Sequence, residues 1–158
     1  MVIRDIKPED NPQLAKIIKA VFEELHAPLV DTVYDDPRTN SLYEQFDGCA
    51  SRYFVVEDEG EVLGGCGYYP TEGLPAGYAE LVKFYFAPKL RGRGVGSQIF
   101  GKVIGEARIA GYTHLYIESF PEFAVAVSLY KKHGFVPLPN RLGHSGHFGT
   151  SIHMVKEL

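Results

Sequence analysis

The segment Arg91–Ser97 (Arg-Gly-Arg-Gly-Val-Gly-Ser) places three glycines and two arginines directly before a stretch with helical periodicity. Glycines let a backbone come close to a ligand, because a Cβ atom would hold the ligand away. The free N–H groups at the start of a helix, together with the helix dipole, favour the binding of phosphate. With Lys89, the region carries three positive charges in an otherwise acidic chain. It therefore predicts a site for a polyphosphate group.

Two well-known phosphate-binding loops do not match this segment. The pattern G-x-x-x-x-G-K-[ST] is absent, and the glycines follow G-x-G-x-G instead of the dinucleotide-binding G-x-G-x-x-G. Glycine spacing by itself is a weak signal. A turn that only lets a strand enter a helix is therefore the alternative interpretation.

A carboxylate on the expected strand 78–87 is the first candidate for a general base. Alternation along a strand places Glu80 on the same face as Val82, Phe84 and Phe86. Burial beside apolar side chains raises the pKa of a carboxyl group, so Glu80 could accept a proton directly or through an ordered water. The alternative is an exposed residue at the start of the strand.

Glu118, on the expected strand 115–119, is the second candidate, for the base or for a contact with substrate. Its alternative is a structural salt bridge. His144 and His147 lie in a glycine-rich loop, but a zinc site formed by them with His153 lacks acidic or thiolate partners at useful spacing. We therefore expect no metal.

Aspartates in the long loop 26–40 are candidates for attracting a cationic amine. Asp31, Asp35 and Asp36 all lie in this loop. A solvated loop is the favoured interpretation, because charged residues in a long connection usually face water.

The elements that must position these residues can be read from the hydrophobic pattern. Apolar residues recur at helical spacing over 14–25, and Glu59-Gly60 joins two strand-like runs as a hairpin. The predicted order is β-α-α-β-β-β-α-β-α-β-β. We expect an α/β fold of the mixed α+β kind: a mostly antiparallel sheet of six to seven strands flanked by about four helices, not a doubly wound one.

Length and charge exclude several classes of protein. The 158 residues suit one domain, 1–158, and a net charge of -4 argues against non-specific nucleic-acid binding. No apolar run approaches the roughly 20 residues of a membrane span, and the N-terminus does not resemble a signal peptide. Cys49 and Cys66 form no CxxC pair, which suits a reducing compartment. We expect a cytoplasmic protein without nucleic-acid or membrane partners.

Two motifs together resemble the GNAT superfamily of N-acetyltransferases. Arg91-x-x-Gly94-x-Gly96 is similar to that family's acyl-CoA pyrophosphate loop, Q/R-x-x-G-x-G/A. The segment 126–135 (AVSLYKKHGF) is similar to its A-x-x-L-Y-x-x-x-G-F. The resemblance covers essentially the whole chain and implies the GNAT-like acyl-CoA N-acyltransferase fold.

The resemblance implies roles for particular residues. Tyr130 would protonate the CoA thiolate, although by spacing alone it could be a core aromatic beside Val127. His144 or His147 would border the acceptor pocket. Phe123 stands where many members carry an Asn, so one polar contact to the cofactor is missing. The residues implied to hold the cofactor are Phe84, Tyr85, Phe86, Arg91, Gly92, Arg93, Gly94, Val95, Gly96, Ser97 and Tyr130.

The implied activity is transfer of an acetyl group from acetyl-CoA to a primary amine by direct attack on the thioester, with Glu80 as base. Two alternatives are an acyl-CoA-binding regulatory domain without turnover, and an acyltransferase that uses another acyl-CoA or an alcohol acceptor. The acceptor is left open among small amines, antibiotics, polyamines, amino acids and protein amines. A homodimer is also expected from the family.

Overall fold

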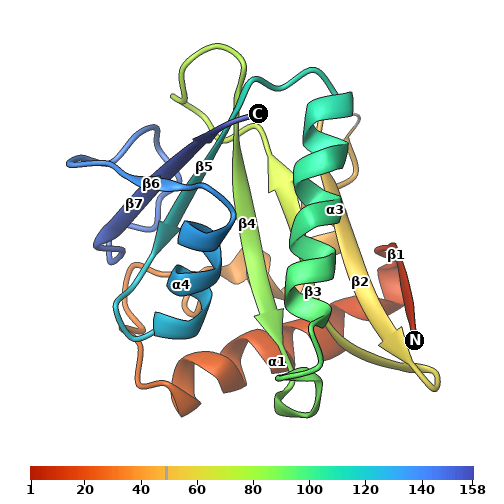
Figure 1. Cartoon of the computed structure of the whole chain (residues 1–158). Helices are drawn as coiled ribbons and strands as arrows, with labels where there is room; N and C mark the ends of the chain where they lie inside the picture. Colours follow the sequence, from red (N-terminus) through yellow and green to blue (C-terminus); the bar gives the residue numbers. More distant parts are fainter. Residues whose placement is uncertain (49) are drawn as a thin grey trace.

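The computed structural model describes residues 1–48 and 50–158, so Cys49 lies outside the described residues. Its strands form one sheet in the order β1-β2-β3-β4-β5-β7-β6 (Figure 1). The strands are β1 (Val2–Asp5), β2 (Arg52–Asp58), β3 (Glu61–Tyr69), β4 (Tyr78–Phe86), β5 (His114–Ser119), β6 (Val136–Pro137) and β7 (Ile152–Glu157). The α-helices are α1 (Asn11–Glu24), α2 (Leu42–Gln45), α3 (Val95–Ile109) and α4 (Ala124–Lys132).

The mixed architecture expected from the sequence is confirmed. Each pair of neighbouring strands is antiparallel except β4 and β5, which run parallel. The hairpin between β2 and β3 turns through Glu59 and Gly60, both with positive φ (51° and 79°). This backbone twist suits a two-residue hairpin and explains the glycine at the second position.

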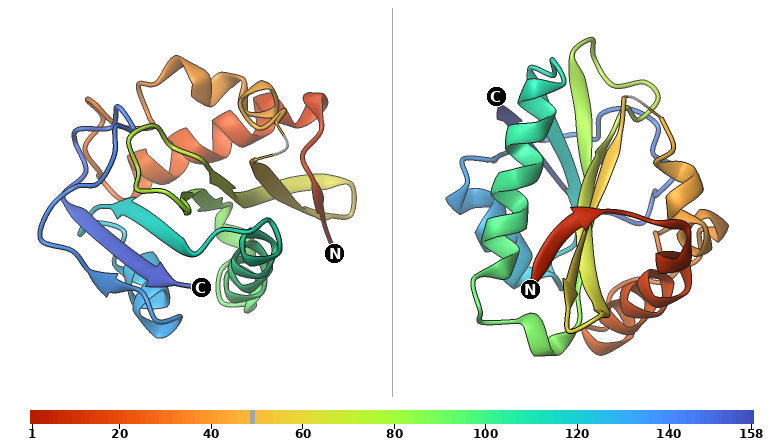
Figure 2. Two further views of the ribbon diagram at one scale, coloured as in Figure 1. Left: turned by 90° about the horizontal axis from the view of Figure 1, so that it is seen from above. Right: turned by 90° about the vertical axis from the view of Figure 1, so that its right-hand side faces the viewer.

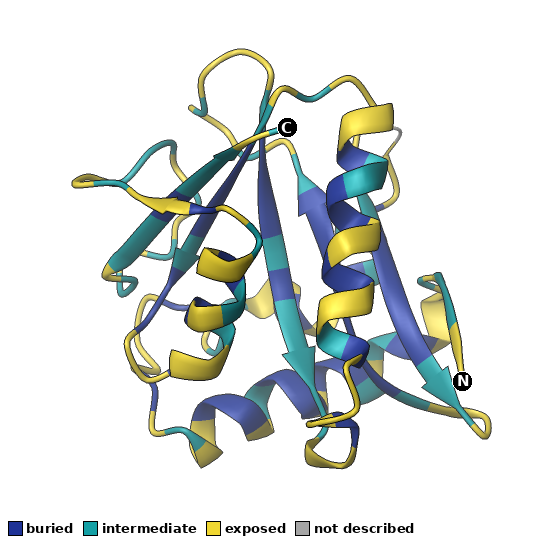
Figure 3. Cartoon of the chain, viewed as in Figure 1, coloured by how far each residue is buried: buried dark blue, intermediate teal, exposed yellow. Residues whose placement is uncertain are grey.

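Helices cover both faces of the sheet. Helix α1 packs on one face, and α3 and α4 pack on the other (Figure 2). Each face has its own cluster of buried side chains, one built around Phe22 of α1 and one around Phe100 of α3. Figure 3 shows the buried residues along the central strands, with the outer sides of the helices exposed.

The parallel strands β4 and β5 pair only over their first residues. The paired residues are Tyr78 with His114, Ala79 with Leu115, and Glu80 with Tyr116. Beyond Glu80 the two strands diverge, and β5 continues in pairing with β7 (Figure 1). The remaining edge of β4 therefore has no paired strand among the described residues.

A bulge interrupts β4 directly after this point. Gly67 pairs with Val82 and Gly65 with Tyr85, so two residues of β4, Lys83 and Phe84, oppose a single residue of β3. Lys83 has a φ of 54°, and its carbonyl oxygen accepts a hydrogen bond from the Tyr53 hydroxyl at 2.8 Å. The extra residue changes which face the following side chains occupy.

The predicted face of Glu80 is therefore wrong in part. Val82 packs in the cluster with α1, as does Tyr85, whereas Phe84 and Phe86 pack in the cluster with α3. Strict alternation would have kept Val82, Phe84 and Phe86 together. The bulge shifts the pattern by one residue, which the sequence pattern does not reveal.

Candidate active site

A cavity of about 240 Å³ lies where β4 and β5 diverge. Both strands line it, together with Tyr130 of α4 and residues from four connecting segments. The polar and charged side chains in its wall are Arg38, Gln45, Tyr69, Thr71, Glu72, Glu80, Lys83, Tyr85, Glu118, Ser119, Tyr130, His144, Ser145, His147 and Thr150. The residues proposed from the sequence as base, acid and substrate contacts thus border one space.

Glu80 is buried in this cavity wall, with 5% of its surface exposed, so the alternative of an exposed residue at the strand start is wrong. Its Oε1 accepts a hydrogen bond from the Thr71 hydroxyl at 2.7 Å. Burial, followed by the nearby charge of Glu118, raises the pKa of Glu80 to about 7. A carboxyl group with such a pKa can take up or release a proton near neutral pH.

Glu118 is engaged by three neighbours. Its Oε2 forms an ion pair with Arg141 at 3.1 Å and accepts a hydrogen bond from the Tyr116 hydroxyl at 2.7 Å. Its Oε1 accepts a hydrogen bond from Ser145. The salt bridge considered from the sequence is therefore present. These three donors occupy most of the roughly four acceptor sites of the carboxylate, which favours Glu80 as the base.

His147, in the cavity wall, contacts the first loop. The Asp36 carboxylate contacts His147 Nε2 at 2.8 Å and Arg38 at 2.8 Å. Burial is the largest influence on His147 and lowers its pKa. Asp36 is thus held by protein partners, and Asp35 accepts from the backbone amides of residues 31 and 32. His144 lies at the same cavity but is exposed.

Lys83 is a cavity residue that the sequence analysis did not identify. Its side chain lines the cavity and is only 7% exposed. Burial lowers its pKa to about 8, although the charge of Glu80 acts in the opposite direction. A lysine in an expected buried strand was the available signal, because an unpaired charge is rarely buried.

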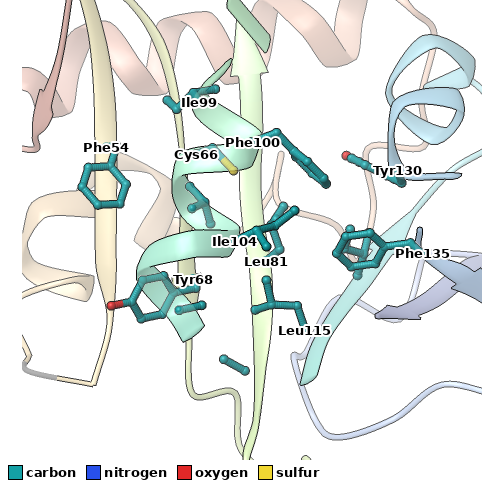
Figure 4. Packing of buried hydrophobic residues seen from close by; sticks show 14 of the residues in the cluster. Phe54, Cys66, Tyr68, Leu81, Ile99, Phe100, Ile104, Leu115, Tyr130 and Phe135 are labelled. Carbon is teal, nitrogen blue, oxygen red and sulfur yellow. The ribbon is translucent and has the colours of Figure 1, made fainter. Parts of the chain in front are cut away.

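Tyr130 is both a core aromatic residue and a cavity residue, so its two interpretations from the sequence are compatible. Its ring stacks on Phe100 with 5.4 Å between ring centroids and lies within the α3 core (Figure 4). It also lines the cavity. Burial raises the pKa of Tyr130 well above its usual value. Its hydroxyl is therefore protonated at neutral pH and can act as a proton donor.

The glycine segment leads directly into α3. Gly92 and Gly94 both have φ of 74°, and Gly94 is the residue before the first helical turn. A Cβ atom at either glycine would meet no protein atom within 4 Å, so the space above this loop is open. The backbone N–H groups of residues 92–97 have no backbone acceptor among the described residues. Together these features fit an anion.

The three cations near this loop have carboxylate partners. Arg91 binds Glu24 at 2.6 Å, and Arg93 lies 3.4 Å from Asp58. Lys89 pairs with Glu61. Water screens exposed ion pairs of this kind and they contribute little to stability, so exchanging a carboxylate for a phosphate costs little.

The loop and the strand edge together fit an acyl-CoA. The free edge of β4 beyond Glu80 can accept an extended chain as an added strand, which suits the pantetheine arm. Phe84, Tyr85 and Phe86 lie on this edge, and the amides of the glycine loop suit the pyrophosphate. The described part of the chain contains no cluster of three metal-ligating side chains and no helix able to cross a membrane.

Comparisons with known proteins agree with this geometry. The model of the acetyltransferase (GNAT) family matches residues 18–135. A protein of Escherichia coli, the uncharacterized N-acetyltransferase YjgM, is 34% identical over 99% of this chain and 95% of its own length.

Solved structures give the same fold. A ribosomal-protein-alanine N-acetyltransferase from Brucella melitensis has a TM-score of 0.78 at 25% identity, with 100% of each chain covered. An acetyltransferase from Salmonella typhimurium, solved with acetyl-CoA, has a TM-score of 0.76 at 21% identity and covers 99% of this chain and 93% of its own. The chain therefore belongs to the GNAT acetyltransferase family and is an acyltransferase.

Proposed function

We propose that this protein transfers an acetyl group from acetyl-CoA to a primary amine, which attacks the thioester directly. The observation that carries this is the divergence of β4 and β5 after Glu80, which opens a cavity between a proton acceptor and a proton donor. The acetyl-CoA in the structure of the Salmonella neighbour supports the choice of donor. When bound, acetyl-CoA supplies the thioester carbonyl.

Glu80 acts on the incoming amine. An ammonium must lose a proton before its nitrogen can attack, and a carboxylate with a pKa near 7 can remove it. The apolar burial that raises the pKa also strengthens the basicity of the ionised form. Glu118 contributes by its charge, and through its contacts with Arg141 and Ser145 it orders the opposite wall.

Tyr130 acts on the leaving side. Its hydroxyl donates a proton to the departing sulfur, and burial keeps that proton on the oxygen until it is needed. Backbone N–H groups of the β4 bulge are the proposed donors to the oxyanion. His144, His147 and Glu118 are proposed to contact the acceptor from their places in the cavity wall.

Tyr130→Phe tests this proposal. Loss of a general acid typically costs about 100-fold or more in rate, so kcat for CoA release should fall by that amount with a panel of amines. The acetyl-CoA dissociation constant should stay the same, because the ring and its stacking remain. Tyr43→Phe, on α2 outside the cavity, is the matched control.

The same assay separates the alternatives. A regulatory domain that only holds acyl-CoA would release no CoA with any amine, and this result would overturn the proposal. An acyltransferase for alcohols or longer acyl chains would prefer those partners in the panel. A cytoplasmic location and a homodimer stay predictions from the sequence.

A further inference from the structure

A largely buried lysine side chain lines the cavity, and no described residue pairs with its ammonium group. Lys83 is only 7% exposed, yet its Nζ makes no ion pair and no hydrogen bond with any described residue. The charges that act on it are those of Glu80, Asp36 and Arg38, and Glu80 and Arg38 line the cavity. The side chain therefore ends at the cavity rather than in the apolar core.

The carboxylates around the cavity do not supply the missing anion. Glu118 is paired with Arg141, and Asp36 with Arg38 and His147. Glu80 accepts from Thr71 and forms no ion pair with Lys83. A charge in a largely buried side chain without a partner is costly, and such groups cluster at functional sites.

The backbone holds Lys83 in this position. As part of the β4 bulge it has a φ of 54°, a conformation that only a few per cent of non-glycine residues adopt. The Tyr53 hydroxyl, itself fully buried, fixes the Lys83 carbonyl at 2.8 Å. The bulge thus directs a cation into the space where the acceptor must bind. Strained residues of this kind cluster at functional sites.

We propose that the acceptor is a small primary amine that also carries a carboxylate, as a free amino acid does, and that Lys83 binds this carboxylate. The inference rests on the proposed acetyl transfer. Arg38 also lines the cavity, but its charge is paired with Asp36, which leaves Lys83 to bind the carboxylate. The amine nitrogen is then directed to Glu80. A cavity of about 240 Å³ lies below the 300–1,000 Å³ usual for drug-sized ligands and suits an acceptor of this size.

This acceptor differs from a peptide N-terminus or a protein lysine in one respect. A peptide N-terminus carries an amide next to its amine, and the amine of a lysine side chain is far from the backbone amides. Neither substrate has a carboxylate next to the reacting amine. A hydrogen bond to a charged group is worth more than a neutral one, and the difference corresponds to about tenfold or more in affinity. Amino acids and their amides are therefore a matched pair of probes.

The experiment measures binding as well as turnover. Alanine, serine, leucine, methionine, phenylalanine and glutamate, each with its α-amide, are titrated into the protein–CoA complex by calorimetry and then assayed for CoA release. At least one free acid should bind about tenfold or more tightly than its amide. Lys83→Met should remove this preference, because the free acid should bind more weakly while the affinity for the amide stays the same.

Two controls accompany this variant. Lys16→Met, an exposed lysine on α1, should keep the preference of the wild type. The acetyl-CoA dissociation constant of Lys83→Met should also be unchanged. If it rises more than a few-fold, Lys83 serves the donor and the inference is wrong.

The remaining outcomes are distinct. If free acids and their amides bind and react equally well, or if only peptides bind and react, the carboxylate site is refuted while the proposed acetyl transfer stands. If no free acid binds at millimolar concentration, the inference is also refuted. If acids bind in a Lys83-dependent way but no amine releases CoA, the anion site stands and the proposed activity fails.

Discussion

At the scale of single residues, two titratable groups of the cavity stand apart from the rest of the protein. Glu80 and Lys83 are both buried, lie three positions apart on β4, and have pKa values moved toward neutrality from opposite sides. Burial is the main cause in both cases, because it disfavours the charged form. Their different neighbours suggest different tasks. Glu80 lies beside another carboxylate, whereas the Lys83 ammonium group forms no ion pair with any described residue.

Glu80→Gln tests the base through the pH profile. Only ionised Glu80 can accept a proton, so kcat/KM of the wild type should rise as the pH increases through about 7. The variant should lose at least about 100-fold in kcat/KM, together with this rise. Steady-state kinetics at constant ionic strength between pH 5.5 and 9, chosen to bracket the pKa, measure both effects.

Glu118→Gln is the control for this profile. Removing the neighbouring negative charge lowers the pKa of Glu80, so the rise should move to lower pH and remain visible. If Glu118→Gln abolishes the rise and Glu80→Gln leaves it, the roles of the two carboxylates are exchanged.

Lys83→Met should make the protein more stable. The folded pKa of Lys83, about 8, lies below its ordinary value of 10.5, so burial of the charged form costs stability below pH 8. This cost declines between the two values and is absent above 10.5. The thermal midpoint of the variant should exceed that of the wild type by a few degrees at pH 7, because each kcal/mol of stability shifts the midpoint by about 2–4 °C in a chain of this size. The gain should shrink by pH 10, and an unchanged or lower midpoint at pH 7 would contradict the account.

At the scale of elements, one strand and one turn do most of the positioning. The bulge in β4 moves Phe84 and Phe86 to the α3 face and directs Lys83 into the cavity. The loop at residues 92–94 ends in a left-handed glycine that begins α3 with its amides unpaired. The strand was predictable from its apolar residues. The bulge was not, because no residue type requires one at Lys83.

Gly94→Asp should abolish acetyl-CoA binding. The added Cβ and carboxylate enter the open space above the loop, where they repel the pyrophosphate. We expect a loss of at least about tenfold in affinity by calorimetry. Gly94→Asn has the same size and tolerates a positive φ, so it separates charge from backbone strain.

A second glycine on the same helix controls for the substitution itself. Gly101 lies within α3, and a Cβ atom added there would meet no protein atom within 4 Å. Gly101→Asp should bind acetyl-CoA as the wild type does. Normal binding by Gly94→Asp would refute the assignment of the loop.

At the scale of the whole molecule, positive charge gathers around the glycine loop although the protein is acidic. The chain carries a net charge of -4, yet Lys89, Arg91 and Arg93 stand around the glycine loop. In the structure these cations are matched by Glu61, Glu24 and Asp58. The pairs keep the loop close to neutral until a phosphate replaces a carboxylate. The sequence showed the cations but not their partners, which come from α1 and the β2–β3 hairpin.

Acetyl-CoA should stabilise the whole fold. A ligand that binds only the native state at 100 times its dissociation constant adds about 2.7 kcal/mol, which corresponds to about 5–10 °C for a chain of this size. Differential scanning fluorimetry with acetyl-CoA measures this shift. In Gly94→Asp the shift at the same ligand concentration should fall by about half or more, and a wild type without a shift would contradict acyl-CoA binding.

The roles of the site residues named from the sequence stay predictions, whereas the family and the order of elements could be predicted from it. These depend on local patterns: apolar periodicity, a hairpin turn, glycines before a helix, and two motifs separated by a strand. Glu80, Glu118, Tyr130 and His147 were named from such patterns, and all of them line one cavity.

What those residues face depends on the three-dimensional arrangement of the chain. The divergence of β4 from β5 and the β4 bulge arise from pairing between distant segments, which side-chain periodicity does not record. For the same reason the partners of Glu118, and the lack of a partner for Lys83 among residues 1–48 and 50–158, became visible only in the folded structure. A charge is seen to lack a partner only when every neighbour has been placed.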